Sequence, residues 1–156
     1  MIRIQGTRFG DVEVNDQTVI RFPQGILGFT SEREFVLLED DPGRTIGFLQ
    51  SVTSPDLSFP VVDAAPFSDA CPELAPDKLA TKLAMRDDIT ADDVAVLTIV
   101  APNPTGERLE ANLLAPLVID TKTRCGKQIL LDFRAFQGLH LVTLGSRVAN
   151  ATATAV

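Results

Sequence analysis

The sequence has few of the side chains from which catalytic and metal sites are built. Its 156 residues include no tryptophan, no tyrosine, one histidine and two cysteines. A Ser–His or Cys–His pair, or a histidine-rich metal site, would have to include His140. His140 alternates with Leu139 and Leu141, so we expect a structural role on the polar face of a strand. Cys71 and Cys125 have no second thiol or histidine beside them, and we expect free thiols.

Long apolar runs are also absent. No run approaches the roughly 20 residues that a membrane helix needs, and the N-terminal MIRIQGTRFGDVEV alternates like a strand and does not resemble a signal peptide. We therefore expect a cytoplasmic protein. The adjacent aspartates at 40–41, 87–88 and 92–93 lie where they can cap turns or helix ends, and nothing near them supplies the apolar pocket of a general acid. The glycine spacing matches no nucleotide-binding pattern, so we expect neither a cofactor nor an enzyme.

The formal net charge is −7. This charge weighs against direct binding to nucleic acid, where neutralisation of phosphates dominates the affinity. An acidic surface would instead attract a basic protein partner and speed the encounter. The alternative is that the charge only keeps the protein in solution.

Short apolar or alternating runs separated by turn residues predict a mainly β protein. In the segment DDPG, Pro42 and Gly43 suit the centre of a type II turn. The loops PNPTG and TKTRCGK each predict a hairpin. We expect strands at residues 2–4, 12–14, 18–22, 35–39, 46–52, 59–63, 94–101, 108–114, 116–120, 128–132 and 139–144.

One segment has helical character. Pro76 suits the first turn of a helix, and Leu79 and Leu83 share one face of a short helix over residues 76–85. Thr90 and Asp93 have the spacing of a helix cap. With the strands, this pattern predicts a small antiparallel β-barrel-like or sandwich domain with one short helix. We expect the domain to cover residues 1–145 and the tail at 146–156 to be flexible.

The stretch FPQGILGF, residues 22–29, is apolar but contains a proline and two glycines. These residues suit a forced corner between two strands, with Phe22 and Phe29 turned inward. The alternative is an exposed apolar loop that meets a partner. The two explanations differ at Ile26 and Leu27, which lie either in the core or in water.

Two further places offer candidate binding residues. Lys122, Arg124 and Lys127 form the densest basic cluster, which is either a solvated hairpin tip or a docking point for an acidic segment or carboxylate. Asn112 is unusual in a strand, because its side chain competes with backbone pairing. It either closes a local turn before Pro116 or presents its amide to a partner.

Several motifs, in this order along the chain, resemble the FliW family of bacterial flagellar assembly factors. The chain departs from the family pattern at AAPF (64–67), at Cys71 and after Phe133. The motifs that carry the resemblance are TRFG (7–10), FPQGILGF (22–29), FVLLE (35–39), LQSVTSPDLSFPVVD (49–63), DVAVLTIV (93–100) and ANLLAPLVIDTKTRCGKQILL (111–131).

The resemblance implies a β-barrel-like, non-enzymatic regulator that binds flagellin and the RNA-binding translational repressor CsrA. Members of the family are expected to antagonise CsrA allosterically, so that flagellin translation follows flagellin secretion. The alternative is a cytoplasmic flagellin chaperone with no role in translation. No contact with nucleic acid or membrane is expected. The candidate partner-binding residues are Gln24, Ile26, Leu27, Asn112, Lys122 and Arg124.

Overall fold

A computed structural model describes residues 1–39, 46–69, 71–102, 104–107 and 109–131, and the backbone of 141–143. Its strands are β1 (Ile2–Thr7), β2 (Gly10–Val14), β3 (Ile20–Arg21), β4 (Glu34–Leu38), β5 (Ile46–Ser51), β6 (Ser58–Asp63), β7 (Val94–Pro102), β8 (Leu109–Asn112), β9 (Leu117–Asp120), β10 (Cys125–Gln128) and β11 (Leu141–Thr143). The helical elements are α1 (Pro76–Leu83) and the short 3-10 helices η1 (Asp16–Thr18), η2 (Ala65–Phe67), η3 (Pro72–Leu74) and η4 (Ala91–Asp93). No helix among the described residues is long and apolar enough to span a membrane.

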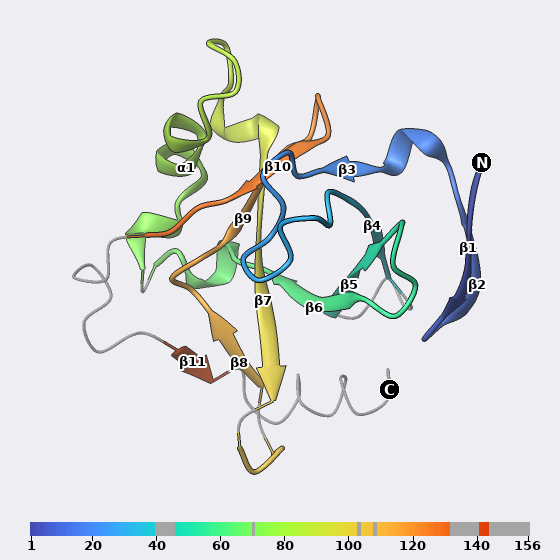
Figure 1. Ribbon diagram of the computed structural model, residues 1–156. Helices are drawn as coiled ribbons and strands as arrows, with labels where there is room; N and C mark the ends of the chain where they lie inside the picture. Colours follow the sequence, from blue (N-terminus) through green and yellow to red (C-terminus); the bar gives the residue numbers. More distant parts are fainter. Residues whose placement is uncertain (40–45, 70, 103, 108, 132–140, 144–156) are drawn as a thin grey trace.

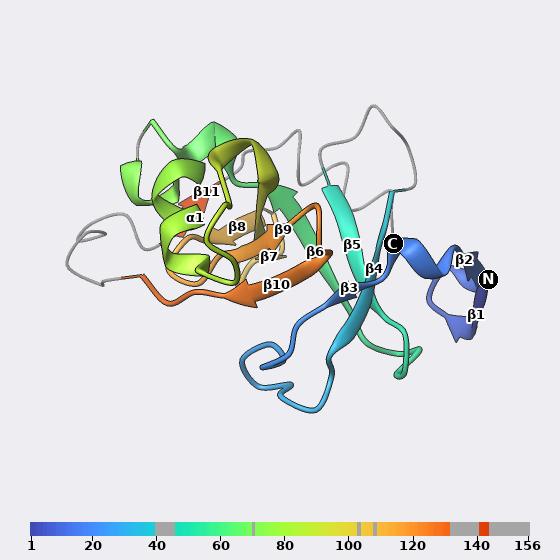
Figure 2. The same cartoon turned by 90° about the horizontal axis from the view of Figure 1, so that it is seen from above.

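The strands form a large mixed sheet and a separate two-stranded ribbon, β1–β2, at one end of the molecule (Figures 1 and 2). The large sheet has the order β11-β8-β7-β6-β5-β4-β3-β10-β9, and β9 also pairs with β7. The pairings therefore run from β7 through β6, β5, β4, β3, β10 and β9 and return to β7, which gives the barrel-like shape. The prediction of a mainly β, barrel-like fold with one short helix is confirmed.

Strand β7 links the two parts of the large sheet. Its first half pairs with β9 from Val94 to Leu97, and its last residues pair with β8 from Val100 to Pro102. Between these segments it pairs with β6 through Leu97, Thr98 and Ile99. The ring of strands and the β8–β11 extension are thus built on one continuous strand.

Helix α1 covers one side of the sheet. Its buried residues Leu79, Ala80 and Leu83 pack into a core with Val62, Val96 and Val118 from the strands. Pro76 occupies its first turn, as predicted, and the chain leaves the helix at Ala84 with φ 46°. A second core on the other side of these strands includes Phe22, Ile26, Phe35, Leu49 and Leu117. Each side of the strands around β7 therefore has its own apolar layer.

Two strand predictions need correction. The strand expected at 18–22 is limited to Ile20–Arg21, because η1 occupies the preceding residues under the Asn15 cap. The strand expected at 128–132 is Cys125–Gln128 in the structure: β10 begins inside the segment predicted as a hairpin loop, since Arg124 adopts a left-handed φ of 58° and shortens the turn. The predictions for the aspartates at 40–41, Pro42, Gly43, His140 and the tail at 146–156 lie outside the described residues.

The junction between β3 and β10 is a parallel pairing that rests on Arg21 opposite Cys125. The Arg21 amide donates to the carbonyl of Arg124 at 2.9 Å. Beside this pair, the buried Phe22 ring occupies the space that a side chain on Gly126 would need: a Cβ there would lie 2.7 Å from Phe22 Cε1. A glycine at 126 therefore allows β3 to approach β10.

We predict that Gly126→Ala lowers the free energy of unfolding by about 1–3 kcal/mol, because the Phe22 ring is enclosed and must shift. Gly47→Ala in β5 is the matched control, since its added Cβ would meet the mobile end of Leu37 at 3.1 Å. Urea unfolding of both variants measures the difference. Equal losses of unfolding free energy in the two variants would contradict the expected cost of displacing the Phe22 ring.

Candidate functional site

The loop between β3 and β4 is folded into a tight corner. The Gly25 amide donates to the Phe22 carbonyl at 2.8 Å, and the Phe29 amide donates to the Ile26 carbonyl at 2.7 Å. Gly25 has φ 70°, and a Cβ at this position would lie 2.6 Å from Thr30 Cα. The backbone at Gly25 therefore excludes any larger residue and fixes the direction of the loop.

This corner separates Ile26 from Leu27. Ile26 is 2% exposed and packs in the core with Phe22, whereas Leu27 is 58% exposed at the tip of the turn. Gln24 is also exposed. The prediction that Phe22 turns inward is confirmed. The same prediction for Phe29 is wrong: it is 40% exposed, because the turn leaves it at the rim against the Phe59 ring, with centroids 5.2 Å apart.

The side chain of Gln128 connects the tip of the loop to the β9–β10 hairpin. Gln128 Oε1 accepts the Leu27 amide at 2.8 Å, and Gln128 Nε2 donates to the Ala115 carbonyl at 3.1 Å. Beyond Gln128 the side chains alternate, so that Ile129 is buried and Leu130 is 67% exposed. Because alternate residues of an extended chain share a face, Gln128 and Leu130 point to the same side, where Leu27 lies.

The tip of the hairpin is closed by Asp120. Its Oδ1 accepts the amide of Lys122 at 3.0 Å, and its carbonyl accepts the amide of Arg124 at 2.8 Å. Arg124 Nη2 in turn donates to the Thr18 carbonyl at 2.6 Å, which joins the tip to the chain just before β3. The structure thus places Arg124 beside Thr18 and the start of β3, and Lys122 beside Asp93, at the end of β10 away from the contact between Gln128 and Leu27.

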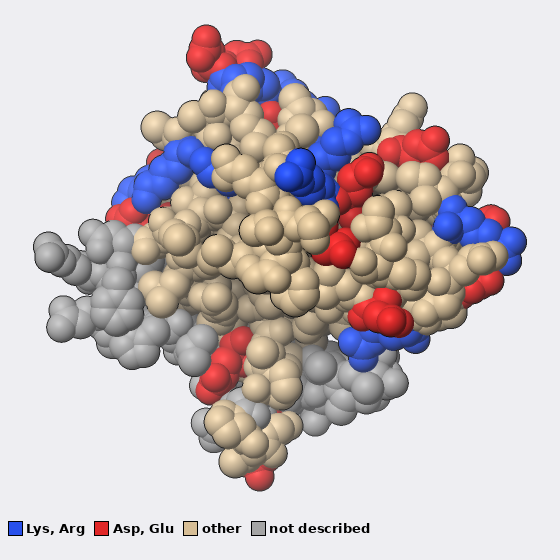
Figure 3. Space-filling view, in the orientation of Figure 1, with Lys and Arg blue, Asp and Glu red and all other residues tan. Residues whose placement is uncertain are grey.

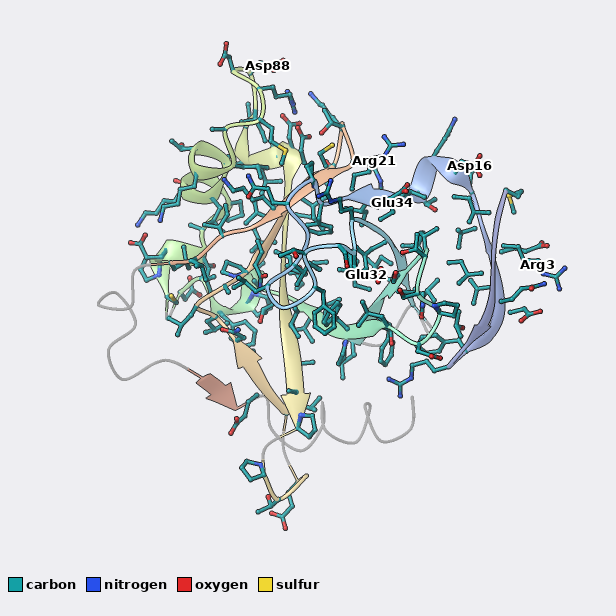
Figure 4. The ribbon with its side chains drawn as sticks, in the orientation of Figure 1. Arg3, Asp16, Arg21, Glu32, Glu34 and Asp88 are labelled. Atoms are coloured by element: carbon teal, nitrogen blue, oxygen red, sulfur yellow. The ribbon has the colours of Figure 1, made fainter. Side chains whose placement is uncertain are left out.

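We call this surface the loop–hairpin face; it comprises residues 21–30 and 121–130. Figures 1 and 2 show the loop and β10 on the same side of the molecule. In Figure 3, Lys and Arg side chains lie over β3 and the hairpin, and acidic side chains lie beside the uncharged surface over the loop. Figure 4 shows Arg21 beside Glu34, its partner in the strand register.

A carboxylate also holds the far end of the loop. Glu32 accepts hydrogen bonds from Ser51 Oγ at 2.7 Å and Thr53 Oγ1 at 2.8 Å, and from the Ser54 hydroxyl. These hydroxyls, that of Ser54 most strongly, lower the pKa of Glu32. The ionised side chain therefore ties the loop to the β5–β6 turn (Figure 4).

An ion-pair network anchors the hairpin from the opposite side. Arg86 Nε contacts the fully buried Asp120 at 2.7 Å, and its other nitrogens contact Asp93 at 3.0 Å and Asp88 at 2.8 Å. Lys122 Nζ lies 3.3 Å from Asp93. The contact with Arg86 lowers the pKa of Asp120. Lys122 is therefore not a free charge but the outermost member of this network.

Asp93 also completes the predicted capping box with Thr90. The Thr90 amide donates to Asp93 Oδ2 at 3.1 Å, and this bond, with Arg86 and Lys122, lowers the pKa of Asp93 to about 2. Sequence reasoning found the cap but missed Arg86 and Asp120. The one available signal was an aspartate at the end of the apolar run PLVID.

Asn112 lies apart from the loop–hairpin face. It ends β8, where it stands opposite Leu141 of β11. Asn112 Oδ1 accepts the amide of Leu114 at 3.1 Å, and its carbonyl accepts the hydroxyl of the buried Thr98 at 3.1 Å. The side chain oxygen thus closes the local turn that leads from β8 to β9.

The arrangement suits contact with another protein. Within the described ranges, no group of three or more His, Cys, Asp or Glu side chains is placed to hold a metal ion. A cleft of about 360 Å³ lies beside α1, and its lining includes Asp77, Thr81 and Arg86. The guanidinium of Arg86 is already engaged by aspartates. The loop–hairpin face, with exposed apolar and basic side chains on a rigid frame, is the stronger candidate.

Comparison with known proteins identifies relatives of the chain. The family profile described as "FliW protein" matches residues 3–140. The chain is 36% identical over 131 residues to a flagellar assembly factor FliW of Desulfitobacterium hafniense, covering 84% of each chain. It is 38% identical over 132 residues to one of Heliobacterium modesticaldum, again covering 84% of each chain. A crystal structure of the flagellar assembly factor FliW superposes with a TM-score of 0.67 at 32% identity, covering 83% of this chain and 88% of the other.

We predict opposite outcomes for aspartate at the two central loop residues. Ile26→Asp should lower the free energy of unfolding by about 4 kcal/mol or more, because it buries an unpaired charge. Leu27→Asp should change it by at most about 0.5 kcal/mol, since the side chain is in water. Thermal and urea unfolding measure both. A folded, stable Ile26→Asp variant would contradict the burial of this residue.

We also predict that the Arg86 network contributes stability that acid removes. The pKa of Asp93 in the folded protein, about 2, lies below its ordinary value of about 3.9. The contribution is therefore complete above pH 5 and is lost as the pH falls through 4 towards 2.

Asp93→Asn tests this pH dependence. The variant should be less stable than the original chain at pH 7, and the difference in urea midpoint should shrink between pH 5 and pH 2. The control is Asp92→Asn, at an exposed neighbouring position. If the difference in urea midpoint between Asp93→Asn and the original chain does not change with pH, the charge of Asp93 does not stabilise the fold.

Proposed function

The chain belongs to the FliW family of flagellar assembly factors, and on this basis we propose that it acts in the cytoplasm by binding flagellin and the translational repressor CsrA. Free CsrA represses the flagellin mRNA. While flagellin accumulates, it occupies the factor; when flagellin is exported, the factor is released, binds CsrA and allows translation to resume. In this way the rate of flagellin synthesis follows export.

The observation that carries a binding role is the rigid exposure of apolar side chains on the loop–hairpin face. Leu27 is 58% exposed, although its own amide is fixed by Gln128. A surface that is already ordered loses little conformational entropy when a partner docks. The net charge of −7 further supports the pairing with CsrA, because an RNA-binding protein is basic and is attracted over long distances.

The proposed roles of the candidate residues follow from their positions. Gln24, Leu27, Lys122 and Arg124 are proposed to contact a partner on the loop–hairpin face. Ile26 acts indirectly, because it is buried and supports the turn. Asn112, on another part of the sheet, would belong to a second contact. We further propose that the antagonism of CsrA is allosteric, so that the RNA groove of CsrA stays unoccupied by this partner.

The second candidate is a flagellin chaperone without a role in translation. The apolar tip of the loop favours it, because covering an apolar segment of an unassembled subunit needs such a surface. The two candidates share flagellin binding and differ only in the effect on CsrA.

We expect the purified chain to bind both purified flagellin and purified CsrA, and each partner to displace the other. Calorimetry with each partner alone, followed by competition, measures this. A translational reporter of flagellin in a strain that lacks the gene should fall if the factor releases CsrA repression. An unchanged reporter with intact flagellin binding would favour the chaperone, and binding to neither partner would refute both candidates.

A further inference from the structure

The loop between β3 and β4 is bonded mainly to itself. The pairing of β3 with β4 ends where the Phe22 amide donates to the Arg33 carbonyl at 2.7 Å. We call residues 23–32, which lie beyond this bond, the strap; Figure 2 shows it projecting beyond β3 and β4. Its backbone hydrogen bonds run among residues 22–32, and none joins it to a described residue elsewhere in the chain. The strap is therefore a compact loop with adjacent ends, closed at its base.

Two polar side chains attach the strap to the rest of the molecule. At its tip, the Leu27 amide donates to Gln128 Oε1 at 2.8 Å. At its far end, Glu32 accepts the hydroxyls of Ser51 and Thr53 at 2.7 and 2.8 Å, and that of Ser54. Each attachment is made by a side chain, so the strap can separate without breaking a strand pairing.

The strap buries little apolar surface. Ile26, at 2% exposed, is its one buried apolar side chain, and Phe29 is 40% exposed although its ring meets that of Phe59. Strand β5, in contrast, is paired on both sides and buries Phe48 and Leu49. Local opening occurs where few buried contacts and no strand ladder hold the chain. Fewer contacts thus hold the strap than hold the strands to which it is joined.

We propose that the strap opens as a unit while the sheet stays folded, and that Gln128 and Glu32 are the side chains that hold it closed. In the closed state Leu27 is exposed and Ile26 is hidden. In the open state Ile26 leaves the core and lies in water with Leu27. A partner that contacts both side chains can bind only the open state, so the opening equilibrium sets its apparent affinity. The inference concerns the chain alone, and its test needs no partner and is separate from that of the proposed function.

Native-state hydrogen exchange of the original chain, followed by NMR in low concentrations of urea, tests the opening. The amides of Gly25, Leu27, Phe29 and Glu32 should share one protection factor, about 100-fold or more below that of the β5 amides, because only the contacts of the strap must break. Their exchange should depend little on urea, since opening exposes little surface. If they share the protection and urea dependence of β5, the strap opens only when the whole protein unfolds, and the proposal is wrong.

Two variants separate opening of the strap from global unfolding. Gln128→Ala removes an attachment, so the protection of all four strap amides should fall about 10-fold, and Glu32→Ala should act in the same way. Val62→Ala weakens the core beneath α1, which stays packed when the strap opens. This variant should lower the protection of the β5 amides by about 10-fold or more and leave the strap amides unchanged.

Gln24→Ala is the matched control for Gln128→Ala. Gln24 is an exposed glutamine of the strap, its side chain makes no hydrogen bond within the described structure, and its replacement should change no protection factor. If Gln128→Ala speeds exchange only at Leu27, whose own bond it breaks, the strap is not a unit and the proposal is wrong. Equal loss of protection in the strap and in β5 for Val62→Ala would also overturn it.

Discussion

The fold depends on the close approach of Phe22 to Gly126. A strand of two residues, β3, joins β10 through one parallel pair, and so few backbone hydrogen bonds stabilise the junction only weakly. The Phe22 ring adds apolar contact there, since it is fully buried against β10 and against Phe35. The ring of strands thereby continues through β3, and the loop that begins at Phe22 is placed over the hairpin that contains Gly126.

The candidate site is a consequence of that junction. With Phe22 fixed, the tight turn at Ile26 directs Leu27 outward, and Gln128 lies within reach of its amide. The Arg86 network holds the same hairpin through Asp120, which is buried and ionised at the end of β9. A buried carboxylate is costly unless it is paired and hydrogen-bonded, and Asp120 meets both conditions through Arg86 and the amides of the turn. The surface is thus ordered from two sides.

Much of the fold could be predicted from the sequence, because alternation and turn residues mark most strands and Pro76 with its leucine pair marks the helix. The start of β10 could not: CGKQ has little intrinsic strand preference, and its conformation comes from pairing with β9 and from the Phe22 ring. Within the site, the spacing of apolar residues cannot show which of Ile26 and Leu27 is buried, since side chains in a turn do not alternate regularly between two faces. The Arg86–Asp120 pair joins positions 34 residues apart, so only tertiary structure reveals it.

Strand β7 fixes the register of its neighbours. It pairs with β9 over its first residues, with β6 over its middle and with β8 over its last. A slip of β7 by one residue would therefore break the pairing with all three strands at once, and it would exchange the buried and exposed faces of the strand. One strand of nine residues thus sets the relative positions of β6, β8 and β9.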